Sequence, residues 1–447
     1  MELPFDGETL ARIGREAAAA AWADGLSVLK PDGAVVPIPL VAEPEPFSRE
    51  ELAALAREAR AILSGAVKLA RALLERGDAR DRASLTGPFE GLEAEAMARL
   101  FAEAPVPAVV ARVDFLRPAE PGAAPRALEL NATIPAMPAY ADLAAHAWLR
   151  AAARARGLPP RRAEELVAAC GSNMEQFRAA LQAFHEARGG ARARPSIAVV
   201  ARPGDAQVGE LRRLVAHFRQ MGHRTELLVP ADCQPEEWDL LYRHVWAHNT
   251  PAGSPFARAL RAPGRYVLAN PVNGLLEAKA LFARLSECAE DAGLAALAGL
   301  DAEERAAAGR LPWTRRLDEA LRPRLLAERE RFVLKRSWDY GGKSVHLGAE
   351  LEPEAWARAV DAAVADGRGG GFVAQERVFA PWRPATRVAP EGVSRLDLVR
   401  DVSTYTGLGT AWPTGSVVRA AASPIVNILG GVGLAPVLPA EVLAELA

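Results

Sequence analysis

The chain has 447 residues, and its 50% hydrophobic content is enough to build two or three domains with sizeable cores. Its 54 Lys and Arg residues nearly balance its 56 Asp and Glu residues, and the net charge of −2 argues against nucleic acid or a membrane surface as a partner. Cys170, Cys233 and Cys288 lie far apart without a CxxC pair, which argues against a disulfide framework or a cysteine-bound metal and favours a cytoplasmic location.

Residues 1–105 are predicted to form a helical N-terminal region. The start, MELPFDGETL, is acidic and lacks the basic and apolar segments of a signal peptide, so we expect no export. From Ser48 to Glu75 apolar residues recur at helical spacing, with Ser48 as an N-cap and Glu51 three residues later. This pattern predicts one long amphipathic helix or a pair of helices.

Residues 106–190 are predicted to hold two adjacent strands, PAVVARVDFLRP and RALELNATIP, followed by helices from Ala141 onward. Arg112 and Asp114 are two residues apart in the first strand, and Glu129 and Asn131 are two apart in the second. Each pair therefore projects from one face of its strand. A carboxylate and an amide oxygen that face a cleft are ligands suited to Mg²⁺, although exposed strand faces often carry the same residues.

Residues 191–300 change pattern after the Gly/Arg-rich segment GGARARP, which we take as a domain boundary. The strand SIAVVARPG, the helix GELRRLVAHFRQMG and the strands RTELLVP and DLLYRHVWAH follow in turn, which predicts a parallel α/β unit. We interpret His244 and His248 as structural hydrogen-bonding groups. Trp246 and Trp338 are expected in the core or in the wall of a cleft.

Residues 301–447 begin with a charged helical stretch that leads into FVLKRSWDYGGKSVHLG, at 332–348. Lys335 follows an apolar strand and requires an anion; Asp339 can hold Mg²⁺, and Gly341 and Gly342 let backbone N–H groups approach phosphate oxygens. The GxxxxGK[ST] loop is absent. A strand, a β-turn and a surface lysine would give a similar string, and that alternative stays open. Short strands are expected from Gly371 to the C-terminus.

The order and spacing of several motifs resemble a known enzyme family. The motifs are Glu129 with Asn131, Lys279 in NGLLEAKALFARL, Lys335, Asp339 with its glycines, FVAQERV at 372–378, and Arg419 ahead of Gly430, Gly431 and Gly433. In this order they resemble the eukaryotic glutathione synthetases and the glutathionylspermidine synthetases, which are permuted ATP-grasp ligases. The resemblance runs over roughly residues 106–435 and implies an α/β permuted ATP-grasp fold with an inserted parallel α/β substrate-binding domain.

The resemblance also implies site residues. Glu129, Asn131 and Asp339 would bind Mg²⁺, and Lys279, Lys335, Gly341 and Gly342 would contact the phosphates of ATP. The hinge beside adenine would be Gln375, Glu376 and Val378. Arg112 and Arg419 would be catalytic and would face a carboxylate substrate, joined in binding it by Arg243, Gly430 and Gly431. The glycines from 430 to 433 would form a lid.

The implied activity is ATP- and Mg²⁺-dependent joining of a carboxylate to an amine, through an acyl phosphate, on an amino acid, a small peptide or a polyamine. Two alternatives remain: a nucleotide-binding or regulatory protein without turnover, and a phosphotransferase on the same scaffold. Tyr340 and Lys343 depart from the family loop, and Lys343 has no family counterpart. Assembly as a homodimer is left open.

Overall fold

The computed structural model describes residues 4–120, 122–339, 344–426 and 433–446. A seven-stranded sheet forms its centre, in the order β15-β3-β18-β17-β16-β5-β6, with neighbours antiparallel except for the pair β18 and β3. Its strands are β3 (Leu40–Val41), β5 (Ala111–Leu116), β6 (Arg126–Asn131), β15 (Arg383–Ala389), β16 (Gly392–Thr406), β17 (Ser416–Ala421) and β18 (Gly433–Ala435).

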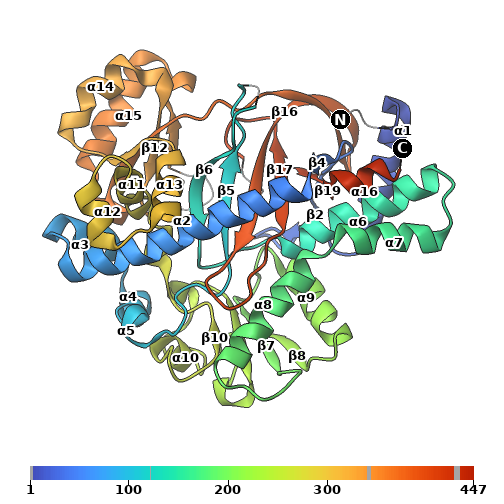
Figure 1. Ribbon diagram of the computed structural model, residues 1–447, viewed down its shortest axis with the longest axis horizontal. Helices are drawn as coiled ribbons and strands as arrows, with labels where there is room; N and C mark the ends of the chain where they lie inside the picture. The colour runs from blue at the N-terminus through green and yellow to red at the C-terminus, as the bar shows by residue number, and fades with distance from the viewer. Residues whose placement is uncertain (1–3, 121, 340–343, 427–432, 447) are drawn as a thin grey trace.

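Helices cover the two faces of this sheet (Figure 1). The long helix α2 (Arg49–Arg76) lies on one face and packs with Phe115 and Val418 in one core, while α1 (Gly7–Ala23) and α6 (Pro138–Ala155) pack with Val417 and Tyr405 on the other. Successive residues of β17 thus enter different cores, as the two-residue period of a strand requires. The α2 helix begins at a capping box between Ser48 and Glu51.

A second, four-stranded antiparallel sheet has the order β11-β14-β12-β13. Its strands are β11 (Thr314–Arg316), β12 (Phe332–Arg336), β13 (Val345–Leu347) and β14 (Phe372–Glu376). Phe332 and Leu334 pack against Trp356 of α15 (Pro353–Ala365), beside α14 (Arg322–Ala327). Because side chains alternate along a strand, Val333 and Lys335 face away from these helices.

A third sheet is parallel, in the order β10-β9-β7-β8, and lies in a separate lobe of the molecule (Figure 1). Its strands are β7 (Ile197–Ala201), β8 (Thr225–Leu228), β9 (Leu240–His244) and β10 (Leu268–Ala269), and α8 (Asn173–Ala187) and α9 (Val208–Gln220) share a core with it. The predicted parallel α/β unit is confirmed.

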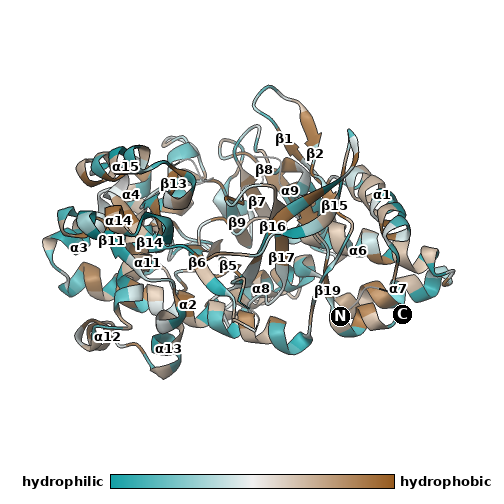
Figure 2. Ribbon diagram, turned by 90° about the horizontal axis from the view of Figure 1, so that it is seen from above, coloured by the Kyte–Doolittle hydropathy of each residue, from teal (hydrophilic) through white to brown (hydrophobic). Residues whose placement is uncertain are grey.

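The remaining elements are short or cover the edges of the sheets. The outer helices α12, α13 and α15 carry teal and brown residues in mixture, as amphipathic helices do (Figure 2). The α-helices not yet described are α3 (Ala79–Thr86), α4 (Gly91–Met97), α5 (Leu100–Glu103), α7 (Pro160–Cys170), α10 (Ala257–Arg261), α11 (Lys279–Glu287), α12 (Ala292–Ala298), α13 (Ala302–Arg310) and α16 (Ala440–Ala444). Two further strand pairs are β1 (Ser27–Leu29) with β2 (Val35–Pro37), and β4 (Glu45–Phe47) with β19 (Val437–Pro439).

The mixed α/β class, the single long helix after Ser48 and the strand pair β5 and β6 agree with the sequence-based expectations. The N-terminal region differs, because β1 to β4 lie among its helices. These strands have two or three residues each, too few for a two-residue period to be visible in the sequence. The predicted domain boundaries remain predictions. Among the described helices, none combines the length and the apolar composition needed to cross a membrane.

Candidate functional site

A cleft of about 380 Å³ lies between the four-stranded antiparallel sheet and the β5 and β6 edge of the central sheet. A volume of this size suits a small-molecule ligand. Its walls include most of the residues that the sequence singled out, together with several aromatic residues. The lining residues include Arg112, Asp114, Leu116, Leu128, Glu129, Asn131, Trp246, Glu277, Lys279, Val333, Lys335, Trp338, Asp339, Leu347, Gln375, Glu376, Val378, Asp401 and Arg419.

Strands β5 and β6 present four polar side chains to this cleft. In their antiparallel register Arg112 lies opposite Asn131, and Asp114 lies opposite Glu129. All four therefore share one face, while the alternate residue Val113 is buried in the core beside α2. The sequence-based prediction that each pair shares a face is confirmed.

Two arginines and two aspartates form a buried network at one wall. Arg112 binds Asp114 in a bidentate pair, with Nε to Oδ1 at 2.7 Å and Nη2 to Oδ2 at 3.0 Å. Arg419 donates from Nη2 to Asp114 Oδ2 at 2.9 Å and from Nε to Asp401 Oδ2 at 3.0 Å. Burial alone would raise the pKa of Asp114, but the guanidinium groups of Arg112 and Arg419 hold it well below its usual range.

The two arginines differ in how many of their side-chain nitrogens remain available to bind a ligand. Arg112 uses all three of its nitrogens, since Nη1 also donates to the Ala136 carbonyl at 3.0 Å. Arg419 Nη1 makes no hydrogen bond with the described part of the chain, although the residue lines the cleft. Arg419 can thus receive a carboxylate directly, whereas Arg112 holds the network in place.

Lys335 is a half-buried cation whose hydrogen-bond partners among the described residues are uncharged. Its Nζ donates to Gln375 Oε1 at 2.7 Å and approaches the Leu128 carbonyl at 3.5 Å. Burial lowers the pKa of Lys335 to about 8, and attraction to Glu129 offsets this in part. An anion bound in the cleft would stabilise this partly desolvated ammonium group, which has no carboxylate partner among the described residues.

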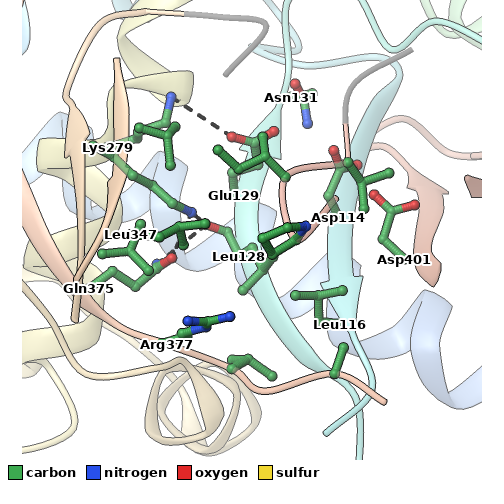
Figure 3. A pocket seen from close by; sticks show the side chains of 18 of the residues that line it. Asp114, Leu116, Leu128, Glu129, Asn131, Lys279, Leu347, Gln375, Arg377 and Asp401 are labelled. Carbon is green, nitrogen blue, oxygen red and sulfur yellow. Dashed lines mark hydrogen bonds and ion pairs between the residues drawn. The ribbon is translucent and has the colours of Figure 1, made fainter. Parts of the chain in front are cut away.

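Lys279, at the start of α11, lies nearby and points toward Glu129 (Figure 3). Its Nζ donates to the Asp339 carbonyl at 2.9 Å and is 3.8 Å from Glu129 Oε2. The Asp339 carboxylate in turn accepts a hydrogen bond from Ser344. Two lysines and two acids from three segments, namely β6, the start of α11, and β12 with the residues after it, therefore meet in one part of the cleft.

Glu129, Asn131 and Asp339 fit a hard cation that shares its ligands with a bound anion. Among the described residues the buried Nδ2 of Asn131 has no hydrogen-bond partner, so this donor is left for a ligand, while the amide oxygen is the atom that could bind a cation. Within the described residues, no group of three or more His, Cys, Asp or Glu side chains could hold a metal ion by itself. One or two carboxylates completed by substrate oxygens are the usual Mg²⁺ environment.

Apolar side chains line the cleft near the predicted hinge. In Figure 3 Leu347 lies beside Gln375, Leu128 lies in the middle, and Leu116 lies on the far side of Arg377, which also lines the cleft. The Glu376 N–H donates to the Trp313 carbonyl at 2.7 Å and is thus used by the sheet. The Val378 N–H makes no hydrogen bond with the described residues, so it can donate to a ligand.

Arg243, among the described residues, does not line the cleft. Arg243 is completely buried and donates to the carbonyls of Val245, Asn270 and Pro271 at 2.8 to 2.9 Å. Burial lowers the pKa of Arg243 to about 10. The expectation that Arg243 contacts a substrate is therefore corrected, because its guanidinium is occupied by backbone. Gly341, Gly342, Lys343, Gly430 and Gly431 lie outside the described residues.

Sequence reasoning missed two acids of the cleft. Asp401 lies opposite Arg419 in the register of β16 and β17, and nothing distinguishes it in the sequence of β16, which also carries Asp397, Arg395 and Arg400. Glu277 lies two residues before Lys279 and accepts a hydrogen bond from the Thr133 N–H. Burial raises the pKa of Glu277 to about 7. Nothing in the local sequence distinguishes this glutamate from a surface residue.

No protein-family model matches this chain, and no curated protein matches it in sequence. A glutathione synthetase-like effector from Globodera pallida, in its apo form, has a similar structure with a TM-score of 0.59 and 13% identity, over 98% of this chain and 100% of that chain. A candidate gamma-glutamylcysteine synthetase from Methylobacillus flagellatus KT matches 76% of this chain and 83% of that chain at 13% identity and a TM-score of 0.37. The first likeness supports a glutathione synthetase-like fold; the second is too distant to bear on it.

Proposed function

We propose that the protein is an ATP- and Mg²⁺-dependent ligase of the permuted ATP-grasp type, which joins a carboxylate to an amine through an acyl phosphate. The observation that supports this most is the environment of Lys335. A half-buried ammonium group that lines a cleft, and whose hydrogen-bond partners among the described residues are neutral, is suited to a polyanionic ligand such as a nucleoside triphosphate.

In this proposal the nucleotide lies along the cleft from the hinge to Glu129. The apolar side chains of Leu116, Leu128 and Leu347 contact the base, and the free Val378 N–H donates to it. Lys335 and Lys279 bind the phosphates. Glu129 and Asn131, with Asp339, would hold Mg²⁺, which supplies charge neutralisation for the transferred phosphoryl group when bound.

The substrate carboxylate would bind at Arg419, whose Nη1 is free of internal hydrogen bonds. A carboxylate oxygen attacks the γ-phosphorus, the bond to the β,γ-bridging oxygen breaks, and ADP leaves. The neutral amine nitrogen then attacks the acyl carbon, the phosphate leaves with the bonding electron pair, and the nitrogen gives up a proton to the departing phosphate or to water. The protein contributes position and positive charge through Arg419, Lys335 and Lys279, and it needs no nucleophile of its own.

The test is an assay of purified protein with Mg·ATP and a panel of amino acids, short peptides and polyamines. ADP and phosphate should form when a matching acid and amine are both present, and hydroxylamine should trap the acyl phosphate as a hydroxamate when the acid alone is supplied. Release of AMP would contradict the acyl-phosphate route. A stable phosphorylated product would indicate a phosphotransferase, and nucleotide binding without any turnover would indicate a binding protein.

A further inference from the structure

A second cavity, of about 370 Å³, lies where the loop 407–415 joins β16 to β17. The loop, helices α2 and α6, the start of α8 and strand β19 form its wall. Among the described residues, none lines both this cavity and the cleft. Its volume suits a small-molecule ligand, and the proposed handling of ATP and carboxylate leaves it unused.

Small side chains on two of these helices leave the space open. Ala53 and Ala56 of α2 line it, as do Ala141 and Ala145 of α6. Cys170 adds a thiol whose pKa burial raises to about 12, so the thiol is neutral at physiological pH. Much of the wall is therefore apolar.

Trp412 lines the cavity from a loop that is held at both ends. The guanidinium group of Arg60 lies 3.6 Å from the centroid of the Trp412 ring and donates to the Gly407 carbonyl. At the other end, the Thr414 N–H and hydroxyl group donate to Gln176 Oε1 at 2.6 and 3.1 Å. Arg60 does not line the cavity, so its contact leaves part of the indole ring to the cavity. A preformed aromatic surface thus borders the space.

Two side chains of the wall keep hydrogen-bond donors for which the described part of the chain offers no partner. Thr414 occupies Gln176 Oε1, so Nε2 lies on the opposite side of the amide, and this atom makes no hydrogen bond with the described residues. Arg57, on an exposed part of α2, forms no hydrogen bond or ion pair with them either. Both groups can donate to an acceptor in the cavity.

The charged groups at this cavity leave an excess of positive charge. Among the described lining residues, Arg49 and Arg57 face one acid, Asp142. Behind the wall, Arg60 forms no ion pair with the described residues, and Glu441 accepts a hydrogen bond from the Arg49 N–H at 3.3 Å. With these two included, three arginines face two acids.

The acid of the wall is engaged by the fold. Asp142 accepts four hydrogen bonds, at 2.6 to 3.0 Å, from Ser172, Asn173 and Met174 at the start of α8. Oδ1 of Asn173 has no partner among the described residues, but it packs against Gly415, where a Cβ would come within 1.7 Å of it, and is shielded there. An uncommitted guanidinium group, a free amide donor and surplus positive charge are suited to a carboxylate.

We propose that this cavity is a second small-molecule site, which binds a carboxylate that carries an aromatic ring. Arg57 and Nε2 of Gln176 would bind the carboxylate, while Trp412 and the alanines of α2 and α6 would contact the ring. The inference is independent of the proposed ligase function, because no described residue of the cleft takes part. A bound ligand would contact Ser416, the first residue of the strand that carries Arg419.

The test is isothermal titration calorimetry of the full chain, without nucleotide, with phenylacetate and phenylacetamide. The two probes share their ring and their shape, and they differ in charge. Phenylacetate should bind at least about tenfold more tightly than the amide. Equal affinities, or no heat from phenylacetate at millimolar concentration, overturn the proposal.

Variants then locate the site. Arg57→Gln removes one exposed charge and should weaken phenylacetate binding about fivefold. Trp412→Leu should weaken it by a similar factor, because the probe loses its aromatic contact. Arg154→Gln is the control, since Arg154 pairs with Glu16 outside the cavity; it should leave the affinity unchanged. Wild-type affinity in Arg57→Gln or in Trp412→Leu contradicts the site.

The cleft offers a carboxylate site of its own at Arg419, so Arg419→Lys separates the two sites. This variant should keep the wild-type affinity for phenylacetate. A loss of binding in Arg419→Lys without a loss in Arg57→Gln would place the probe in the cleft and overturn the second site. The proposed ligase function is decided by the release of ADP and phosphate, which this titration does not measure, so the two proposals can fail separately.

Discussion

The ammonium group of Lys335 donates a hydrogen bond of 2.7 Å to the side-chain oxygen of Gln375, and both residues line the cleft. The two lie on the neighbouring strands β12 and β14, and Gln375 is itself held by a hydrogen bond from its Nε2 to Thr314 Oγ1 at 3.1 Å. A neutral partner fixes the position of the lysine without cancelling its charge. The positive charge therefore remains for a ligand.

Lys335→Met should abolish turnover, by at least about a hundredfold, while the free energy of unfolding changes by less than about 1 kcal/mol. Lys335 is half-buried and forms no ion pair with the described residues, so removing its charge removes a desolvation cost that offsets the lost hydrogen bond. Phosphate release and thermal unfolding measure the two effects. Lys68→Met is the matched control, since Lys68 pairs with Glu304 away from the cleft; it should keep activity. Global unfolding of Lys335→Met would contradict the assignment of Lys335 to the cleft.

Gln375→Glu should weaken nucleotide binding and raise thermal stability together. The new carboxylate would form an ion pair with Lys335 at the same position, and so would stabilise the buried cation and compete with the phosphates. Equilibrium binding of a fluorescent ATP analogue and a melting curve provide the measurements. Gln375→Met serves as the comparison, because it removes the hydrogen bond without adding charge. Tighter nucleotide binding in Gln375→Glu would count against a phosphate near Lys335.

Much of the site was predictable, because it depends on the two-residue period of strands. Arg112 with Asp114 and Glu129 with Asn131 share faces that alternation alone identifies. The burial of Arg243 could not be predicted from the sequence. Its guanidinium group donates to the carbonyls of Asn270 and Pro271, on a segment that only tertiary folding brings close. Glu277 was missed for the same reason, because its partner Thr133 is distant in sequence, whereas Asp401 was missed because the register that sets it opposite Arg419 could not be read from the two strands alone.

Asn131→Ala should weaken binding of Mn²⁺, used as a probe for Mg²⁺, in the presence of an ATP analogue. Asn131 would supply one of few protein ligands, so its loss should raise the dissociation constant about tenfold or more. Electron paramagnetic resonance of free Mn²⁺ gives the constant. Asn173→Ala, at the start of α8 and away from this cleft, is the control. Unchanged Mn²⁺ binding in Asn131→Ala would remove Asn131 from the metal site.

Arg419→Lys and Arg112→Lys should have different consequences. Arg419→Lys should raise the KM for the carboxylate about tenfold or more, because a lysine lacks the free second arm that Arg419 Nη1 offers. Arg112→Lys should lower the free energy of unfolding by about 3 kcal/mol, since it breaks a buried bidentate pair with Asp114. Steady-state kinetics and chemical unfolding separate the two. Equal effects on KM and stability for both variants would contradict the division of roles.

The free energy of unfolding of the wild-type protein should fall as the pH rises, because of Glu210, and Glu210→Gln should abolish this part of the pH dependence. Glu210 is buried beside the Ala139 N–H, and its Oε2 has no partner. Burial raises the pKa of Glu210 to about 8, against hydrogen bonds from Met137 and Ala139, so the folded protein holds this carboxyl protonated at neutral pH. The unfolded chain releases that proton above its ordinary value of 4.5. The contribution of Glu210 is therefore fully present below pH 4.5 and is lost as the pH rises through about 8.

Between pH 5 and 8 the wild-type free energy of unfolding should fall relative to Glu210→Gln by roughly 3 kcal/mol, which is the order expected for a shift of this size. Urea unfolding of both proteins across that range measures the difference, in which all other titrating groups cancel. Exposed Glu354, in the first turn of α15, gives the control Glu354→Gln, which should follow the wild-type curve. Parallel curves for wild type and Glu210→Gln would mean that Glu210 is ionised in the folded protein, and would imply an unseen cation or solvent path beside it.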